Sequence, residues 1–375
     1  MAMPELYLGL MSGTSMDAID VALVDLSDSI QLIHKQAYAL PAPLRQRIHQ
    51  AVIAPEGGTL DEALALDHEL GELFAQCSLN LLQLSATPAC KIQALGCHGQ
   101  TVRHRPLAAR HTTLQLGDPN IIAARTGITT VSDFRRADMA QGGQGAPLAP
   151  IFHKALFAQA GYPRIVVNIG GIANITWLKP DEPPFGFDCG PGNALLDAWI
   201  AYQRNLTYDA GGAWALQGQV QPPLLSSWLM DPYFSLPPPK STGRDYFNLD
   251  WLMSRSFGSI ERLPAEHIQA TLCALTAQTI ADAIHRHCNG ARDVIICGGG
   301  AHNDALMQEL QTRLRPLPVF SSAALGIDPD WIEAIGFAWL AKARLEERWG
   351  NIPEVTGARR PAVLGGVYWG SAADK

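Results

Sequence analysis

Glycine-rich turns that carry hydroxyl and carboxylate groups recur along the chain. Residues 12–20 supply hydroxyls, backbone amides and two carboxylates, and similar turns fall at residues 168–174, 188–193 and 298–300. Glycine lets the backbone approach a ligand closely, and successive free N–H groups form a concavity that binds anions. One such turn alone is most simply a tight turn. Because several occur, each beside an expected strand, the pattern favours binding of nucleotide phosphates.

Two common nucleotide-binding patterns are absent from these turns. No GxxxxGK[ST] string occurs and no GxGxxG opens a strand–helix unit, so a Walker-type NTPase and a dinucleotide-binding fold are both disfavoured. Within the first turn, Asp17 and Asp20 could reach a Mg²⁺ ion through water. The alternative is an Asx-type hairpin turn whose aspartates are solvated.

Asp188 is the candidate general base. It lies at a strand end beside glycines that leave room for a substrate, just before an amphipathic helix over residues 194–202. Its neighbours Phe187 and Cys189 indicate partial burial, which would raise the pKa of the carboxyl toward a useful value. The alternative is an aspartate that only caps the helix.

Three further segments carry polar or charged side chains that could bind carboxylate and hydroxyl groups. Residues 132–138 alternate acids with arginines, and arginine binds carboxylates bidentately while aspartate holds sugar hydroxyls. A solvated charge cluster fits this segment equally well, and the same two interpretations apply to residues 98–101 and 240–245. Glu333 is an acid within an otherwise apolar helix, so it either pairs with a partner or faces a polar cleft.

The elements that must position these residues alternate between strands and helices. Strand, turn and strand over residues 6–26 are followed by helical stretches at 43–53 and 59–84, the second beginning at a capping-box pattern, Thr59 with Glu62. A similar strand–turn–strand segment returns at residues 164–178, and a further strand at 293–297 precedes a helix. This approximate repeat predicts an α/β architecture with two similar halves. The loop at 237–248 is unusually long for a compact domain.

Composition narrows the class of protein. A chain of 375 residues is about two domains long, and its 47% apolar residues leave ample material for cores. The net charge of −7 gives no case for nucleic acid or an anionic membrane as partner. The seven cysteines include no CxxC pair, and neither a signal peptide nor a membrane-spanning run is expected. We therefore expect a globular cytoplasmic enzyme without structural metal.

Taken together, five strings resemble the anhydro-N-acetylmuramic acid kinase family. They occupy residues 9–17, 96–101, 168–174, 187–193 and 297–303, in the family's order and over nearly the whole chain. Residues 134–135, 239–244 and 333–334 look similar to that family too. One position departs from the pattern, because Ala18 stands where the family usually has glycine. Its methyl group could crowd the turn if the backbone needs a positive φ.

The resemblance implies an actin/hexokinase-like (ribonuclease H-like) fold, with two α/β domains and an interdomain ATP cleft. We expect the first domain at residues 1–133, joined by a returning segment at 351–375, and the second at 134–350. The family converts 1,6-anhydro-N-acetylmuramic acid, ATP and water into N-acetylmuramic acid 6-phosphate and ADP during cell-wall recycling. It also favours a homodimer. The other interpretations are an ordinary sugar kinase acting on a free hydroxyl and a non-catalytic nucleotide-switch module.

The expected site residues follow from the matching strings. Asp188 would be the catalytic base, accepting a proton from water as the water attacks the anomeric carbon while the departing O6 attacks the γ-phosphate. ATP would contact Gly13, Thr14, Ser15, Met16, Asp17, Ala18, Ile19, Asp20, Gly170, Gly171, Gly298, Gly299 and Gly300. The sugar would contact His98, Gly99, Thr101, Asp133, Arg135, Asp138, Gly145 and Glu333. Mg²⁺ would be held through water by Asp17 and Asp20.

Overall fold

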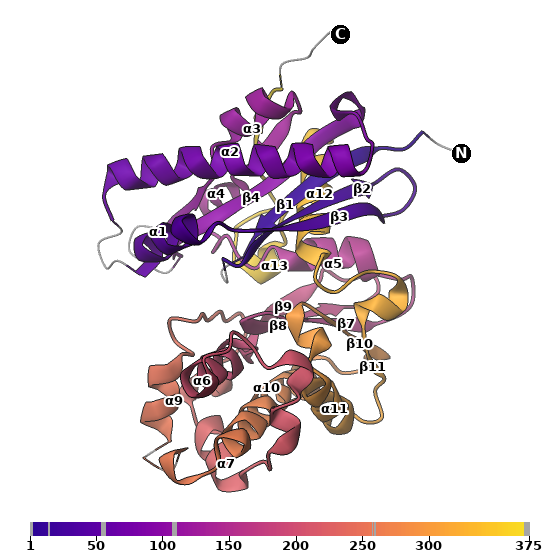
Figure 1. Cartoon of the computed structure of the whole chain (residues 1–375). Helices are drawn as coiled ribbons and strands as arrows, with labels where there is room; N and C mark the ends of the chain where they lie inside the picture. Colours follow the sequence, from indigo (N-terminus) through magenta and orange to yellow (C-terminus); the bar gives the residue numbers. More distant parts are fainter. Residues whose placement is uncertain are drawn as a thin grey trace. The chain divides into compact units, whose positions relative to one another are not determined.

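The computed structural model describes residues 3–13, 16–53, 58–106, 111–256, 258 and 260–370. The chain forms two compact units (Figure 1): a first unit of Met1–Phe152 with Trp331–Lys375, and a second unit of His153–Asp330. The first unit is therefore larger than the domain expected from the sequence. Residues 331–350 belong to it because helix α12 (Ile332–Leu345) packs directly on the central strands of the first sheet, and residues 134–152 belong to it too.

The sheet of the first unit begins with an antiparallel meander and continues with parallel strands. The order is β12-β6-β4-β1-β2-β3, with β5 paired to β4 at the side. β4 runs parallel to β1, and β6 runs parallel to β4. The strands are β1 (Leu6–Ser12), β2 (Ala18–Asp25), β3 (Gln31–Ala39), β4 (Ile92–Arg105), β5 (Thr112–Leu116), β6 (Thr130–Ser132) and β12 (Gly366–Tyr368).

The sheet of the second unit repeats this plan. Its order is β11-β10-β7-β8-β9, with β7, β8 and β9 antiparallel, β10 parallel to β7 and β11 parallel to β10. The strands are β7 (Arg164–Ile169), β8 (Ile172–Leu178), β9 (Phe185–Pro191), β10 (Asp293–Cys297) and β11 (Val319–Ser321). Three antiparallel strands continued by two parallel ones form the ribonuclease H-like sheet. Two copies in one chain confirm the predicted actin/hexokinase-like fold.

Helices cover both faces of the first sheet (Figure 1). Side chains alternate along β1, so Leu8 and Leu10 pack into a core with helix α2 while Gly9 faces α12. A Cβ atom on Gly9 would lie 1.9 Å from the carbonyl oxygen of Ala334, so glycine is required for this close approach. The helices are α1 (Ala42–Ile53), α2 (Leu60–Leu84), α3 (Pro119–Thr126), α4 (Phe134–Ala140), α5 (Ala149–Phe157, spanning the unit boundary), α12 (Ile332–Leu345) and α13 (Pro353–Thr356).

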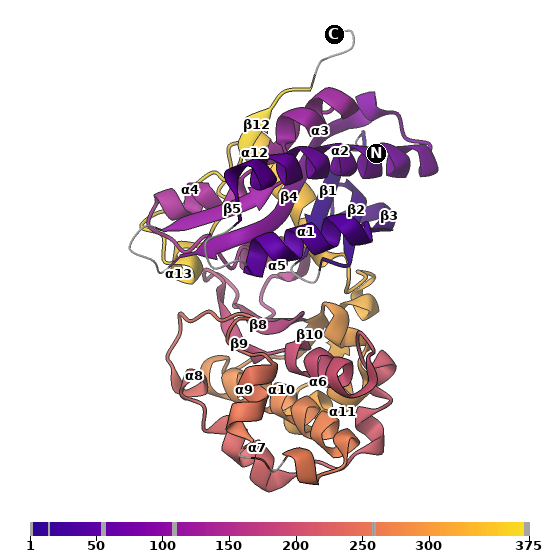
Figure 2. The same cartoon turned by 60° about the vertical axis from the view of Figure 1, so that its left-hand side comes forward.

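The helices of the second unit lie together beside its sheet (Figure 2). They share one large apolar core with that sheet. α10 is buried along most of its length and contributes Leu272, Leu275 and Ile280 to this core. The helices are α6 (Ala194–Arg204), α7 (Pro222–Leu229), α8 (Pro232–Ser235), α9 (Leu249–Arg255), α10 (Ala265–His287) and α11 (Asp304–Arg313). Short 3₁₀ turns lie at Ala89–Lys91, Ala210–Gly212, Ala215–Gln217, Ile260–Arg262, Gly299–His302 and Ser322–Leu325.

Candidate active site

Asp188 is held by the long loop between α8 and α9. It lies on β9 opposite Asn174 of β8, and its backbone N–H donates to the carbonyl oxygen of Lys240 at 3.1 Å. Its Oδ2 accepts a hydrogen bond from the backbone N–H of Thr242 at 3.0 Å. Its carbonyl oxygen accepts from the hydroxyl of Tyr233 at 2.8 Å. The loop therefore fixes the backbone and one carboxylate oxygen of this residue.

Burial makes the Asp188 carboxylate basic enough to act as a general base. It raises the pKa of the carboxyl to about 7, against the opposite effects of the Thr242 N–H and the nearby Lys240 ammonium. A carboxylate with a pKa near the working pH can accept a proton and release it again. The sequence-based expectation of a raised pKa at Asp188 is met in the structure.

A buried carboxylate in turn holds the loop. Asp231 accepts hydrogen bonds from the Tyr246 hydroxyl and the Trp251 indole N–H, both at 2.9 Å, and pairs with Arg255 at 2.9 Å. It also caps α8 by accepting from the backbone N–H of Tyr233. Asp231 thus holds the backbone of Tyr233, whose hydroxyl contacts Asp188.

The Gly170–Gly171 turn lies between β7 and β8. The carbonyl oxygen of Gly170 accepts from the N–H of Asn193, and that of Gly171 accepts from the N–H groups of Gly192 and Ala194. The N–H groups of Gly170 and Gly171 donate to nothing in the part of the chain that the structure describes. The turn therefore directs its carbonyls into the protein and leaves two donors for a ligand.

The glycines at 298–300 follow β10, the parallel neighbour of β7. Gly298 has φ +75°, which glycine adopts without strain, and a Cβ on Gly300 would lie 2.4 Å from Cγ2 of Ile169 at the end of β7. Parallel strands end at the same sheet edge, so this turn and the Gly170–Gly171 turn lie together. The structure thus brings two of the predicted phosphate-binding turns to one edge of the second sheet.

In the first unit, His98 and Arg135 form a cluster with the glycine-rich break after α4. The Arg135 guanidinium donates to Nε2 of His98, at 3.1 Å from Nε and 2.9 Å from Nη2, and to the carbonyl oxygen of Gly145 at 2.8 Å. The other ring nitrogen of His98 lies 2.7 Å from the carbonyl oxygen of Gly99, so it carries the proton. Burial and the Arg135 charge lower the pKa of His98 well below its usual value. The imidazole is therefore neutral.

Asp138 is fully buried beneath this cluster. Its Oδ1 accepts from Asn351 Nδ2 and Thr356 Oγ1, both at 2.6 Å, and its Oδ2 accepts from the backbone N–H of Gly145 at 2.7 Å. Protein donors thus occupy both oxygens that were expected to contact the sugar. This arrangement suits a residue that positions the Gly145 carbonyl, and through it Arg135.

Glu333 lies in the first turn of α12, near Arg135. Burial raises the pKa of its carboxyl, and the Arg135 guanidinium opposes that rise. The ring of Phe337, one turn further along α12, packs 4.8 Å from the imidazole of His98. The sequence left open whether Glu333 pairs with a partner or faces a polar cleft. The structure supports the first interpretation, because the Arg135 guanidinium is its electrostatic partner.

Three other predicted sugar contacts lie around this cluster. Asp133 precedes α4 with φ +61° and pairs with Arg136 at 3.4 Å. Thr101, on β4, accepts from the side chain of Gln115 at 3.2 Å. Gly99 has φ +76°, and a Cβ there would lie 2.7 Å from the carbonyl oxygen of Leu116. The positive φ and the close approach of the Leu116 carbonyl are enough to explain why glycine occupies position 99.

The predicted ATP turn in the first unit is described only in part, since Thr14 and Ser15 lie outside the described residues. Gly13 accepts from the N–H of Met16, whose φ is +56°. Ala18 begins β2 and is not among the residues with positive φ, so its methyl group imposes no backbone strain. Ile19 is fully buried in the core and lies within the sheet, opposite Ser12 of β1.

The two aspartates of this turn point apart. Asp17 pairs with Arg45 of α1 at 3.6 Å. Asp20 lies opposite Met11 on β2, and because its neighbours Ile19 and Val21 face the core shared with α2, it lies on the other face of the sheet. No group of three potential ligands forms in the described part of the chain. Contact of these two carboxylates with Mg²⁺ through water therefore stays a prediction.

Sequence reasoning missed three residues that hold the site. Gln100 accepts from the Ser12 hydroxyl at 2.7 Å and donates to the Gly13 carbonyl, which ties β4 to the ATP turn. Tyr233 and Thr242 hold Asp188. Gln100 lies inside a string that was already recognised. Thr242 lies inside residues 239–244, which the sequence also singled out, whereas Tyr233 carries no local signal because its role depends on how a long loop folds.

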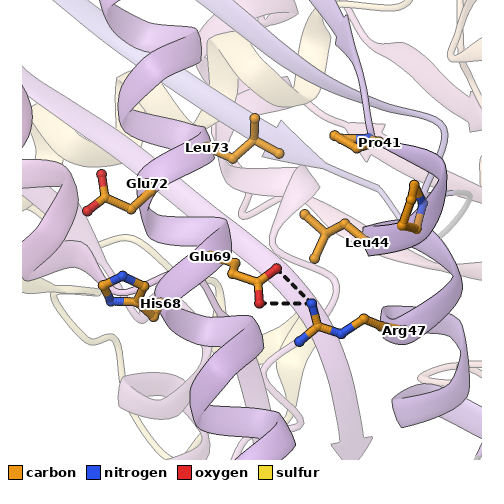
Figure 3. A pocket seen from close by; sticks show the side chains of 8 residues that line it. Pro41, Leu44, Arg47, His68, Glu69, Glu72 and Leu73 are labelled. Carbon is orange, nitrogen blue, oxygen red and sulfur yellow. Dashed lines mark hydrogen bonds and ion pairs between the residues drawn. The ribbon is translucent and has the colours of Figure 1, made fainter.

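An open pocket in the first unit contains none of the predicted site residues. It lies between α1 and α2, where Arg47 reaches across to Glu69 (Figure 3). Its lining is formed by Pro41, Pro43, Leu44, Arg47, His68, Glu69, Glu72 and Leu73. The guanidinium in it is already paired with carboxylates.

The protein-family model for anhydro-N-acetylmuramic acid kinase matches residues 5–370. The chain belongs to the anhydro-N-acetylmuramic acid kinase family. The family member from Saccharophagus degradans is 51% identical over 369 residues, covering 97% of this chain and 99% of that protein. The member from Vibrio cholerae is 48% identical over 371 residues, covering 98% and 100%.

Among solved structures, the activator of the 2-hydroxyisocaproyl-CoA dehydratase from Clostridium difficile with bound ADPNP is similar over 91% of this chain and 96% of that chain, with a TM-score of 0.47 and 13% identity. Among the described residues, no helix combines the length and apolarity needed to cross a bilayer.

Proposed function

We propose that this chain uses ATP and water to convert 1,6-anhydro-N-acetylmuramic acid into N-acetylmuramic acid 6-phosphate and ADP, in the recycling of peptidoglycan. Family membership over residues 5–370 supports the kinase activity and the substrate. The observation that carries the chemistry is Asp188, a carboxylate fixed by Thr242 with a pKa near 7.

The substrate explains why a kinase needs such a base. In the 1,6-anhydro sugar, O6 is locked in an internal acetal and has no proton to lose. Asp188 accepts a proton from water as the water oxygen bonds to the anomeric carbon and the bond from that carbon to O6 breaks. O6 then takes the γ-phosphoryl group, and ADP leaves. Breaking the bridge supplies the nucleophile, and phosphoryl transfer captures the leaving oxygen.

The His98–Arg135 cluster supplies recognition of the sugar in this proposal. A guanidinium presents planar donors that match the lactyl carboxylate bidentately. His98 and the Gly145 carbonyl hold Arg135 in one orientation. The pKa of Glu333 is raised, so its carboxyl group would either accept a hydrogen bond from a sugar hydroxyl or donate one to it. Asp138 would act through Gly145.

The glycine turns at residues 13–20, 170–171 and 298–300 would bind the phosphates of ATP. Phosphoryl transfer depends mostly on positioning and charge stabilisation, which backbone N–H groups supply. Mg²⁺ bound with ATP would neutralise the phosphate charge. Kinases hold this ion with one or two carboxylates and the phosphates themselves, and Asp20 is the residue we assign to it, through water.

A single reaction tests the proposal. The protein is incubated with Mg·ATP and 1,6-anhydro-N-acetylmuramic acid in ¹⁸O-labelled water, and the product is analysed by mass spectrometry. We expect a 6-phosphorylated open-ring sugar that carries one heavy oxygen on the sugar. ADP formed with an unchanged sugar, or phosphorylation of free-hydroxyl sugars instead, would contradict the proposed substrate.

Two expectations complete the proposed function. The family resemblance favours a homodimer, which sedimentation of the purified chain would test directly. A role in recycling places the enzyme in the cytoplasm, where the anhydro sugar and ATP meet, and fractionation of cells would test that location.

A further inference from the structure

Arg244 lies against the Gly170–Gly171 turn. A Cβ atom on Gly171 would be 2.5 Å from Nε of Arg244 and 2.9 Å from its Nη2, so the guanidinium rests on the bare Cα of this glycine. The side chain is exposed, and no hydrogen bond or ion pair to it occurs within the described residues. An arginine without an acidic partner is thus packed onto a turn that has two free N–H donors.

The backbone on both sides of Arg244 is fixed. Two residues earlier, Thr242 donates to the carboxylate of Asp188. Three residues later, Phe247 is fully buried in the core, and its N–H donates to the carbonyl oxygen of Gly243. The guanidinium is therefore placed by the same loop that holds the base, next to the turn and close in sequence to the Asp188 contact.

We propose that Arg244 binds the phosphoryl group that is transferred to the sugar. The group must lie near both the phosphate-binding turn and the reacting sugar, and the loop joins the Gly171 turn to Asp188. A guanidinium binds phosphate oxygens bidentately, and the two free N–H groups of the turn would complete the set of donors. The identity of the sugar in this inference rests on the proposed function. The proposed contact between Arg244 and the γ-phosphate is argued only from residues of the second unit.

The test compares a nucleotide that has the γ-phosphate with one that lacks it. Calorimetry gives the Kd of AMPPNP and of ADP, each with Mg²⁺, for the wild type, Arg244→Ala, Arg244→Lys and the exposed control Arg262→Ala. We expect Arg244→Ala to weaken AMPPNP about 10- to 100-fold, since a charged hydrogen-bond partner is lost, and to leave ADP within about twofold. Lysine should restore part of the loss, and Arg262→Ala should match the wild type.

Gly171→Ala provides a second route to the same contact. Its methyl group must displace the guanidinium, so it should also weaken AMPPNP more than ADP. If the two residues act together, adding Gly171→Ala to Arg244→Ala should cost less than it does in the wild type. Additive losses would contradict a shared contact.

The outcomes separate this inference from the proposed function. Equal weakening of AMPPNP and ADP, or no weakening of either, would overturn the role of Arg244 even if the enzyme phosphorylates the anhydro sugar. A selective loss of AMPPNP in a protein that fails to act on the anhydro sugar would support Arg244 and contradict the proposed substrate. Thermal melting confirms that each variant is folded.

Discussion

Nε2 of His98 accepts hydrogen bonds from the Arg135 guanidinium at 2.9 and 3.1 Å, while Nδ1 of the same ring lies 2.7 Å from the carbonyl oxygen of Gly99. A buried neutral imidazole thus orients a partly buried cation, and the two residues come from β4 and α4, which are distant in sequence. Most positively charged residues keep their freedom in solvent. This arginine gives it up, and a guanidinium held in a fixed geometry is preorganised to bind a ligand.

His98→Ala should therefore raise the KM for the anhydro sugar about 10-fold, because Arg135 loses the acceptor that orients it. Arg135→Ala should raise it at least as much, and the double variant should add little. Because the pKa of His98 is lowered, the KM should stay flat between pH 6 and 8. Steady-state kinetics measure all of these, with His104→Gln as a control on the same strand. Strictly additive effects would mean that the pair does not act as a unit.

The pKa of Asp188 predicts opposite effects on rate and stability. Turnover should rise with pH through about 7, as the base loses its proton, and Asp188→Asn should reduce turnover by several orders of magnitude with nearly unchanged ATP affinity. An aspartate in the unfolded chain titrates near 3.9, so between about pH 4 and 7 the folded protein binds the extra proton. The wild type should thus lose stability in this window as the pH rises.

Asp188→Asn has no such proton to lose, so its melting temperature relative to the wild type should increase from pH 5 to pH 8. Calorimetric or fluorescence melts at the two pH values give this difference directly. The same difference at both values would show that Asp188 titrates elsewhere, and the role of the residue as a base near neutral pH would then fail.

Asp138→Asn should weaken the hydrogen bonds that hold Gly145 and Arg135 in the His98–Arg135 cluster. One carboxylate oxygen becomes an amide donor, which must face either the Gly145 N–H or the donors from Asn351 and Thr356. A buried donor left unsatisfied costs about 1–3 kcal/mol. Urea denaturation should show this loss, and the KM for the sugar should rise with it because the Gly145 carbonyl no longer holds Arg135. Glu354→Gln, in α13, is the control. A normal KM in a destabilised variant would limit Asp138 to stability.

The parts of the fold that the sequence predicted are those encoded by local patterns. The helix expected at 59–84 is observed as α2 (Leu60–Leu84), with Thr59 accepting from the N–H of Glu62 at its start. The strand–turn–strand segments at 6–26 and 164–178 are the first hairpins of the two sheets. Alternation of apolar residues and capping chemistry act over a few residues, so one sequence is enough to detect them.

The sequence could not predict which side chains meet in the folded chain. Asp17 and Asp20 are three residues apart in sequence. In the structure, Asp17 pairs with Arg45, whereas Asp20 lies on β2 with its side chain on the face of the sheet opposite the α2 core. Asp138 looked like a sugar ligand because nothing nearby in sequence reveals Asn351 and Thr356. The family strings pointed to the correct segments, whereas the donors that occupy a carboxylate could be identified only in three dimensions.

Gly96→Ala tests how closely α12 must approach the sheet. A Cβ on Gly96 of β4 would lie 2.0 Å from the carbonyl oxygen of Phe337, which is backbone and cannot move without shifting the helix. Overpacking of this kind costs about 3 kcal/mol, so the urea midpoint should fall and the KM for the sugar should rise as Glu333 and Phe337 move from His98. Gly290→Ala, at φ +87° in open space, should cost only about 1 kcal/mol and leave the KM unchanged. Equal losses from both variants would contradict the dependence of α12 on this close approach.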